Sequence, residues 1–379
     1  MSSQDDRHFG EVARLFLKLG VLAFGGPAAH IAMMRNEVVA RRRWLSEQEF
    51  LDLVGASTLI PGPTSTELAI YLGYRRAGKV GLLLAGLLFI LPAMALVLAF
   101  AWAYVEFGTT PQAGGLLYGI KPVIVAVIVQ AIWGLVRTAV KTPALGVVVI
   151  LTIALYFAGL NPLIPLFGLA IATMLVENRA QLSAHATPAL VLPALGALQL
   201  PAVEGQGLVV LFLTFLKIGA TLYGSGYVLL AFLHDDFVKN LRWIDDQQLL
   251  DAVAVGQFTP GPVFTTATFI GYLVGSWPGA VVATVAIFLP SFLFVALVYP
   301  FVRRLRESPW SSAFLDGANA AAVGLMVAVA WQLGTTSIVD PLTAALALAS
   351  AALLIRWRVN SAWLVLGGGL VGLLATALR

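Results

Sequence analysis

Long apolar segments divided by short polar loops make up most of the chain. They are 15 to 27 residues long and fall at residues 80–106, 115–136, 143–158 and 161–176, then at 279–302, 313–334, 341–355 and 361–378. A helix needs about 20 apolar residues to cross the hydrocarbon core of a bilayer. The pattern therefore predicts an all-α polytopic membrane protein.

The chain also repeats itself at an offset of 198 to 199 residues. The clearest matches are FLKLGVLAFGG (16–26) with FLKIGATLYGS (215–225), RWLSEQEFLDLV (43–54) with RWIDDQQLLDAV (242–253), and the two PGP motifs (61–63 and 260–262). Self-similarity of this kind indicates two homologous units in one chain. We predict an N-terminal repeat over 1–180, a linker over 181–205 and a C-terminal repeat over 206–379.

Basic loops indicate that the two repeats have opposite orientations. Short cytoplasmic loops collect Lys and Arg, and in the first repeat RRAGK (75–79) and RTAVK (137–141) are basic. Their counterparts LVGSWPG (273–279) and GTTSIVD (334–340) contain neither Lys nor Arg. Corresponding loops are therefore expected on opposite sides of the membrane, which predicts two inverted-topology repeats, an arrangement found in many secondary transporters.

The PGP motifs are predicted to lie at the tips of re-entrant hairpins. Residues 45–74 run between two basic segments, and two crossings would leave about 15 residues for each, against about 20 for a full span. We expect this stretch to enter and leave on one side, with Pro61-Gly62-Pro63 at its tip. By inversion, Pro260-Gly261-Pro262 tips a second hairpin from the other side. The predicted fold has about ten full spans plus these two hairpins.

Composition agrees with this fold and removes several functional classes. Of the 379 residues, 59% are hydrophobic and only 11% are charged, against about 25% charged in soluble domains. Cysteine is absent and the four histidines are scattered, so we expect no metal site and no cofactor. The positive charges lie mainly in loops, which topology explains better than nucleic-acid binding does. The short acidic start MSSQDDRHFGE predicts no cleavable signal peptide.

The hairpin tips carry the residues best suited to an anion. Proline is favoured at the first position of a helix, so we expect helices to begin at Pro63 and Pro262 with free N–H groups and a positive dipole end. Small and hydroxyl side chains surround both tips, namely Gly62, Thr64, Ser65, Thr66, Gly261, Thr265 and Thr266. The alternative is a packed kink whose hydroxyl groups bond to their own backbone. Repetition of the motif favours the anion site.

Ionisable residues inside apolar segments are the remaining candidates, because they are costly there unless they have a function. Lys18 and Lys217 occupy matching positions, and Lys121 begins a further apolar segment. Each could neutralise a bound anion or reach out to the membrane interface. For proton coupling we select Glu67, one turn past the first tip. Glu37 and His30 are further proton-coupling candidates.

In this order, these motifs resemble the chromate ion transporter family, in its long, two-domain form. The resemblance rests on FGGP (24–27), Arg-Trp-Leu or Arg-Trp-Ile, PGP and Gly-Tyr in both halves, and it covers nearly the whole chain. It implies a multi-pass protein of the bacterial inner membrane that exports chromate and gives chromate resistance, coupled to protons. It also adds Gly25, Gly26 and Pro27, with Ser225 in the matching YGSG break, to the substrate-binding candidates.

Chromate is not the only substrate that this resemblance allows. Family members often read Glu-Ala-x-Gln after the first PGP, where this chain has Thr64-Ser65-Thr66-Glu67. Sulfate has the same charge and shape as chromate, so transport of sulfate or of another small anion stays open. An anion channel on the same scaffold also stays open, since sequence does not separate a continuous pore from alternating access.

Two other classes are rejected. GYRRAGKV (73–80) nearly matches a phosphate-binding loop but ends in Val80 and follows a helix, so an ATP-driven pump is not expected. No metalloprotease or serine-hydrolase motif is present, so we do not expect an enzyme. The expected partners are chromate or sulfate, protons and membrane lipids. The Gly-rich LVLGGGLVGLL (364–374) could pack within the chain or in a homodimer.

Overall fold

The computed structural model describes residues 3–24, 26–108, 110–179, 207–223, 226, 228–298, 308–357 and 359–378, and every regular element among them is a helix. The first half contains α1 (Ser3–Leu22), α2 (Gly26–Arg35), the π-helix η1 (Asn36–Arg41), α3 (Glu47–Ser57), α4 (Thr64–Phe107), α5 (Pro111–Ala139), α6 (Pro143–Phe157) and α7 (Leu163–Glu177). The predicted linker, 181–205, lies outside the described residues.

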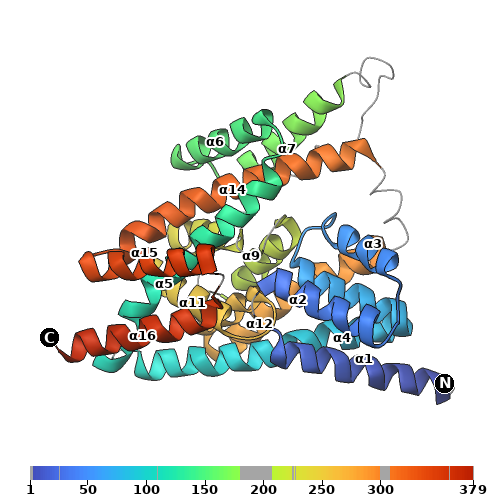
Figure 1. Cartoon of the computed structure of the whole chain (residues 1–379), viewed down its shortest axis with the longest axis horizontal. Helices are drawn as coiled ribbons and strands as arrows, with labels where there is room; N and C mark the ends of the chain where they lie inside the picture. Colours follow the sequence, from blue (N-terminus) through green and yellow to red (C-terminus); the bar gives the residue numbers. More distant parts are fainter. Residues whose placement is uncertain are drawn as a thin grey trace.

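The elements of the second half follow in the same order. They are α9 (Leu208–Thr221), α10 (Leu229–Leu233), the π-helix η2 (His234–Asn240), α11 (Asp246–Phe258), the 3-10 helix η3 (Val263–Thr265), α12 (Thr266–Val298), α14 (Pro309–Ser337), α15 (Pro341–Trp357) and α16 (Ser361–Ala377). Each half thus consists of a broken helix, a π-helix, a short helix that leads to the PGP motif, and a series of apolar helices (Figure 1).

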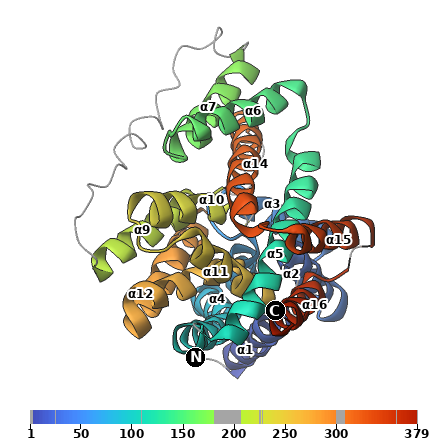
Figure 2. The same cartoon turned by 90° about the vertical axis from the view of Figure 1, so that its left-hand side faces the viewer.

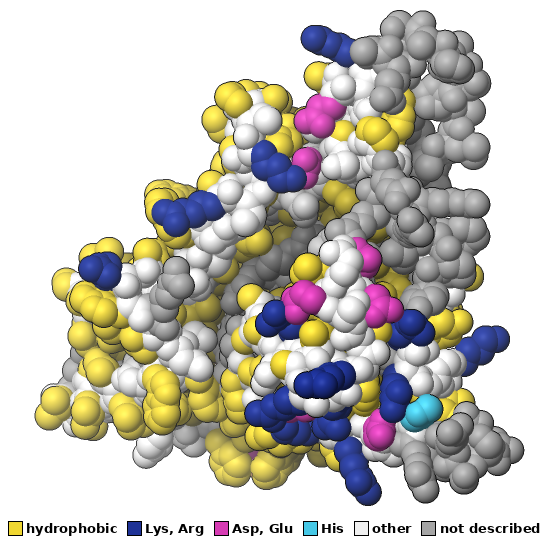
Figure 3. Space-filling view, turned by 45° about the vertical axis from the view of Figure 1, so that its right-hand side comes forward, with side chains coloured by type: hydrophobic (Ala, Val, Ile, Leu, Met, Phe, Trp, Pro, Cys, Tyr) yellow, Lys and Arg dark blue, Asp and Glu magenta, His cyan; other side chains and the backbone are white. Residues whose placement is uncertain are grey.

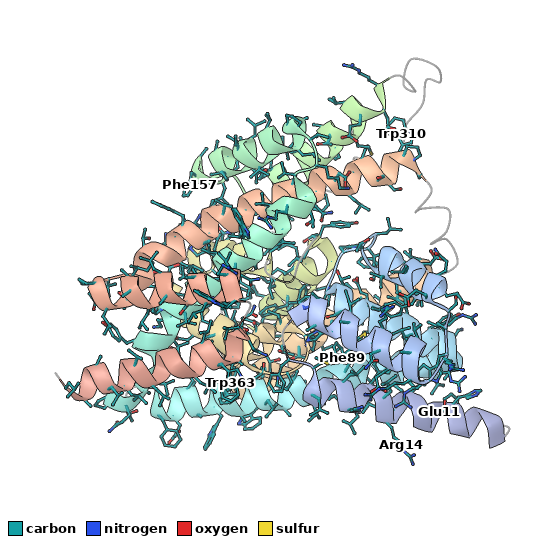
Figure 4. The ribbon with its side chains drawn as sticks, viewed as in Figure 1. Glu11, Arg14, Phe89, Phe157, Trp310 and Trp363 are labelled. Carbon is teal, nitrogen blue, oxygen red and sulfur yellow. The ribbon has the colours of Figure 1, made fainter. Side chains whose placement is uncertain are left out.

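Four of these segments are long and apolar enough to cross a membrane, namely α4, α5, residues 263–298 and α14. The prediction of an all-α membrane protein is therefore confirmed for the described residues. Five further apolar helices have only 14 to 17 residues, namely α6, α7, α9, α15 and α16. Phe157 and Trp363 project outward from α6 and α16 (Figure 4) and are 52% and 71% exposed, as expected of side chains that face lipid. The number of full spans stays a prediction.

The segments α4 and α12 are each two helices joined at a sharp reversal. The backbone leaves helical geometry at Gly78 (φ 59°) and at Ser276 (φ 53°). A Cβ on Gly73 would collide with the carbonyl oxygen of Gly81, so the two arms of α4 must lie against each other. A short helix therefore follows each PGP motif and folds back on the long apolar helix.

The two ends of the first hairpin lie together. Arg42 and Arg76 both stack on the ring of Trp44, at 5.8 and 5.1 Å from its centre. Figure 3 shows Lys and Arg side chains gathered at this end of the molecule, over the N-terminal helices, with hydrophobic side chains dominating the other end. Residues 45–74 therefore leave and return to one basic end, as predicted for the hairpin.

The two halves interlock through their long central helices. Helix α5 packs against α15 and α16 of the second half, while α14 packs against α6 and α7 of the first, and α5 and α14 also contact each other (Figure 2). The Gly-rich α16 lies on α5 so closely that a Cβ on Gly119 would strike the Gly368 carbonyl. Helix α5 thus covers part of the glycine-rich face of α16, and a homodimer stays a prediction.

Candidate functional site

Each PGP loop docks on the broken helix of the other half. The Gly62 N–H donates to the Leu222 carbonyl at 2.8 Å, and the Gly261 N–H donates to the Ala23 carbonyl at 2.9 Å. Ala23 and Leu222 follow the ends of α1 and α9 and are equivalent in the repeat, 199 residues apart. A reciprocal contact of this type is what a two-fold relation produces. Both PGP loops therefore belong to one central junction.

Glycine is required at both loop centres. Gly62 has φ 137° and Gly261 has φ 88°, a region that residues with a Cβ rarely adopt. Space is also missing, since a Cβ on Gly62 would collide with the Glu67 carboxyl group, and one on Gly261 would lie 2.7 Å from the Ala93 Cβ. Only glycine lets the loop reach the carbonyl of the opposite half.

The helices that follow the two loops begin differently. In the first half α4 starts at Thr64, directly after Pro63, and the Thr66 and Glu67 N–H groups bond to the Pro63 carbonyl. The N–H groups of Thr64 and Ser65 precede the first bond within the helix and have no acceptor inside it. In the second half a 3-10 turn, η3, precedes α12. The chain between PGP and Gly-Tyr is one residue shorter there, and a 3-10 turn rises about 2.0 Å per residue against about 1.5 Å for an α-helix.

The hydroxyl groups beside the tips also differ. Thr265 and Thr266 donate to the carbonyls of Pro262 and Val263, both at 2.8 Å. The second tip thus matches the alternative considered from sequence, in which hydroxyls bond their own backbone. In the first tip, Thr66 is fully buried and its Oγ1 has no hydrogen-bond partner among the described residues.

Glu67 is a fully buried carboxyl group at the first tip. Its Oε1 lies against Gly62 and 3.5 Å from the hydroxyl of Ser291 on α12, and its Oε2 has no hydrogen-bond partner among the described residues. Burying a carboxylate charge with so little compensation is costly. Glu67 is therefore chemically suited to hold a proton, and no ionised counterpart exists because Thr266 takes its place in the second half.

His30 connects the first tip to the break between α1 and α2. Its Nε2 lies 3.0 Å from the Ala23 carbonyl, and its Nδ1 lies 3.2 Å from the Ser65 hydroxyl. Gly26 (φ 75°) and Pro27 begin α2 beside His30. Of the other predicted residues at these breaks, Gly25 and Ser225 lie outside the described residues.

A cavity of about 250 Å³ adjoins the first tip. It lies between the PGP loop, the end of α5 and α14, and its polar lining residues are Thr58, Thr64, Thr138, Lys141, Asp316 and Asn319. The Lys141 ammonium group pairs with the Asp316 carboxylate at 2.6 Å. The cavity beside the second tip measures only about 10 Å³, has mostly apolar walls and carries Val263 where the first has Thr64.

The three lysines predicted from sequence pair with carboxylates away from this cavity. Lys18 bonds to Glu37 at 2.7 Å, and its repeat equivalent Lys217 bonds to Asp236 at 2.5 Å. Hydrogen bonding by Lys18 lowers the pKa of Glu37, whereas burial raises the pKa of Asp236 despite Lys217. Lys121 contacts Gln247 at 2.5 Å and Asp251 at 3.4 Å. The structure thus brings Gly62, His30, Ser65 and Glu67 together, without the lysines.

Lys141 is the residue that sequence reasoning missed at this site. It stands in the basic loop after α5, which served only as a topology signal. No local pattern distinguishes it from other loop lysines, because its position beside Thr64 results from the packing of α5 against the first tip and α14. Its repeat counterpart is Val339, so a cation at this position is specific to the first half.

Comparison with known proteins identifies the class. The chromate transporter family matches residues 10–175 and 209–373, so both repeats carry the family's pattern, and the chain belongs to this family. A chromate transport protein of Cupriavidus metallidurans is 35% identical over 96% of this chain and 92% of its own length. One from Pseudomonas aeruginosa is 34% identical over 94% and 90%, and a probable chromate transport protein of Synechococcus elongatus is 33% identical over 92% and 90%. No solved structure matches the chain.

Proposed function

We propose that the protein exports chromate across the cell inner membrane by a secondary active, proton-coupled mechanism. Family membership and relatives that are named chromate transport proteins over 90% or more of their length support the substrate. The membrane potential supports the direction. A dianion leaving a cell whose interior is negative gains about 2.3 kcal/mol per charge for each 100 mV.

The anion site is the cavity at the first PGP tip. Chromate carries two negative charges and four acceptor oxygens, so it needs several donors and a cation. Thr64 and the N–H groups that begin α4 supply donors, and Lys141 supplies a cation. In this state Asp316 neutralises Lys141 at 2.6 Å, so an entering dianion must compete with Asp316. This geometry is the observation that carries the site.

Glu67 is the proposed proton-coupling group. It stands one turn from Thr64 and contacts Ser291 of the other half, so its charge state acts on both the anion site and the junction. A dianion beside a carboxylate is repelled, and a protonated Glu67 therefore favours anion binding. His30, which contacts Ser65, and Glu37, which pairs with Lys18, are secondary proton-coupling candidates.

The two repeats are proposed to be inverted in the membrane. The reciprocal bonds from Gly62 to Leu222 and from Gly261 to Ala23 support a two-fold axis between the halves. The loss of basic residues in the loops 273–279 and 334–340 supports opposite orientation. An axis of this kind places both tips at one depth, where movement of one repeat against the other can expose the site to each side in turn.

The test is uptake of labelled chromate and labelled sulfate into inside-out vesicles, with and without an imposed proton gradient. We compare the wild-type protein with Glu67→Gln and Thr64→Ala, and use Thr335→Ala, an exposed hydroxyl on α14, as the matched control. Gradient-dependent chromate uptake that falls in both site variants but not in the control is the expected result.

The other outcomes separate the alternatives. Sulfate uptake without chromate uptake keeps the site and changes the substrate. Flux that only runs down the anion gradient, unchanged in Glu67→Gln, identifies an anion channel. Absence of flux for either ion in folded protein contradicts the proposal.

A further inference from the structure

A second pair of equivalent ionisable residues differs between the halves in a way that points to proton binding. Arg35 on α2 forms a two-pronged ion pair with Glu47, at 2.6 and 2.8 Å. The equivalent residues of the second half, 199 positions later, are His234 and Asp246, with Nε2 and Oδ1 3.0 Å apart. An arginine stays charged at all accessible pH values, whereas histidine titrates near neutrality. The repeat therefore replaces a permanent ion pair with one that can gain or lose a proton.

The two pairs also differ in burial. The side chains of Arg35 and Glu47 are 54% and 45% exposed, whereas His234 is only 4% exposed and Asp246 is 34% exposed. Asp246 thus reaches solvent, and His234 lies behind it. His234 is the first residue of the π-helix η2, a helix type that is frequent at functional sites.

The buried side of His234 continues into a chain of hydrogen bonds. Its Nδ1 lies 3.0 Å from the hydroxyl of Tyr156 on α6, and that hydroxyl lies 3.1 Å from Oε1 of Gln332 on α14. Tyr156 itself is 1% exposed. The hydrogen bonds therefore run from a partly exposed carboxylate, through a buried imidazole, to two apolar helices that come from different halves.

The number of protons in this chain has two self-consistent values. The Tyr156 hydroxyl has one hydrogen to donate. If it donates to Gln332, then Nδ1 of His234 must donate to Tyr156, and the His234–Asp246 pair holds one extra proton. If it donates to His234, the imidazole is neutral and the Gln332 amide turns its NH₂ group toward Tyr156. Both networks keep the His234–Tyr156 and Tyr156–Gln332 hydrogen bonds, and they differ by one proton and one amide rotation.

Other charged groups lie near His234, but its hydrogen-bond partners are Asp246 and Tyr156. The ionisable groups that face it or its partners are Asp235 and Lys239 of η2, Asp246 of α11, and the Lys217–Asp236 pair between α9 and η2. Lys239 lies over the Tyr156 ring at 4.1 Å, and Asp235 bonds to Asn240. Burial has the largest effect on the pKa of His234 and lowers it, while the nearby Asp246 carboxylate raises it by a smaller amount. Proton uptake is then expected on the acid side of neutrality.

We propose that His234 and Asp246, with Tyr156 and Gln332, form a proton-binding site in the second half that the first half replaces with a fixed ion pair. The binding site is a property of the chain by itself. Its use in transport rests on the proposed function, because a change in this network alters the contact of η2 with α6 and α14 and so acts on the packing between the halves.

The first test needs no transport. Histidine ring resonances of the purified full-length protein, labelled with ¹⁵N, are followed from pH 4.5 to 8.5, and the His234 signal is assigned by its loss in His234→Gln. We expect a His234 transition on the acid side of neutrality. In Asp246→Asn the midpoint of the His234 transition should lie at least about one pH unit lower, because the carboxylate that favours the imidazolium is removed. Tyr156→Phe should also move the midpoint.

A His234 ring that keeps one form over the whole range overturns the proposal. So does a transition that ignores both neighbouring substitutions. Arg35→His serves as the matched control, because its ring would lie in an exposed pair and should titrate near its ordinary value.

The second test addresses transport. His234→Arg copies the first half and fixes the charge at this position. The pH profile of chromate uptake into inside-out vesicles between 5.5 and 8 should therefore lose the contribution of His234, while the KM for chromate and the contribution of Glu67 remain. A variant that retains the wild-type pH profile overturns the coupling. If the wild-type protein moves no chromate, the proposed function fails, and the resonance titration still decides the proton site.

Discussion

The two PGP tips have the same backbone and different chemistry. Both glycines have positive φ, and both donate to the carbonyl that ends the broken helix of the other half. The first tip buries Glu67 and adjoins a polar cavity of about 250 Å³, while the second has Thr266 bonded to its own backbone and a cavity of about 10 Å³. The two tips therefore share one backbone geometry, and the ionisable side chain Glu67 and the polar cavity belong to the first tip.

The lysine pairs teach the complementary lesson. Lys18–Glu37 and Lys217–Asp236 are equivalent and both are formed, so they belong to the shared scaffold, whereas the sequence left open whether each lysine meets the anion or the membrane interface. Symmetric charges hold each π-helix to the first helix of its half. The charged groups that differ between the halves, at Glu67, Lys141 and His234, are the ones proposed to bind protons and the anion.

The largest expected effect is on stability, which should fall more when Lys217 is replaced than when Lys18 is replaced. Lys217→Met leaves Asp236, whose side chain is 9% exposed, without its cation, and an unpaired buried charge costs about 3–5 kcal/mol. Lys18→Met leaves Glu37 with Arg41 and Arg42 at 3.1 and 3.3 Å, and Lys18 is 45% exposed, so the expected loss is about 0–1 kcal/mol. Denaturation of the two purified variants measures the difference, and equal stability would refute it.

Next in size are the loop glycines. Gly62→Ala and Gly261→Ala should each destabilise the protein by at least about 1–3 kcal/mol, because both positions need positive φ and lack room for a Cβ. The control is Gly168→Ala in α7, where nothing lies within 4 Å of the added Cβ. Thermal unfolding monitors all three. A wild-type Tm for Gly261→Ala together with a lowered Tm for Gly62→Ala would contradict the conclusion that the two loops share one backbone scaffold.

A substitution at Glu67 should separate function from stability. Glu67→Gln removes an ionisable group whose Oε2 has no hydrogen-bond partner among the described residues, so the Tm should not fall. Gradient-driven chromate uptake should fall at least about tenfold, equivalent to about 1.4 kcal/mol. Thr266→Val, at the matching position, should leave the proton dependence unchanged. Uptake by Glu67→Gln with the wild-type proton dependence would contradict the assignment.

The smallest effects concern the cavity cation. Lys141→Gln should raise the KM for chromate roughly tenfold, as expected for loss of one charge-assisted contact of about 1.5 kcal/mol. Asp316→Asn should lower the KM, since the lysine is released from its 2.6 Å pair. Arg137→Gln, in the last turn of α5 and stacked on Trp133 at 4.7 Å, is the control. A KM that moves in the same direction in the Lys141 and Asp316 variants would exclude the cavity as the entry site.

Much of the helical plan could be predicted from local patterns. The segment predicted at 143–158 is Pro143–Phe157 in the structure, and that predicted at 341–355 is Pro341–Trp357. Proline at the start and apolar length decide such helices. The π-helices η1 and η2 were not predicted, and the pairs that Glu37 and Asp236 form with lysines 19 residues away depend on tertiary packing. The sequence left open whether each lysine meets the anion or the membrane interface, because it does not reveal these carboxylate partners.

The amino-acid sequence by itself determined the all-helical class, the two repeats and the position of both PGP breaks, because apolar length, self-similarity and the missing N–H of proline are local properties. Tertiary structure decided which residues meet at the breaks. Gly62 reaches Leu222 across 160 residues, and Lys141 reaches Asp316 across 175. Such pairs depend on how α4, α5, α12 and α14 pack, and packing is a property of the whole chain.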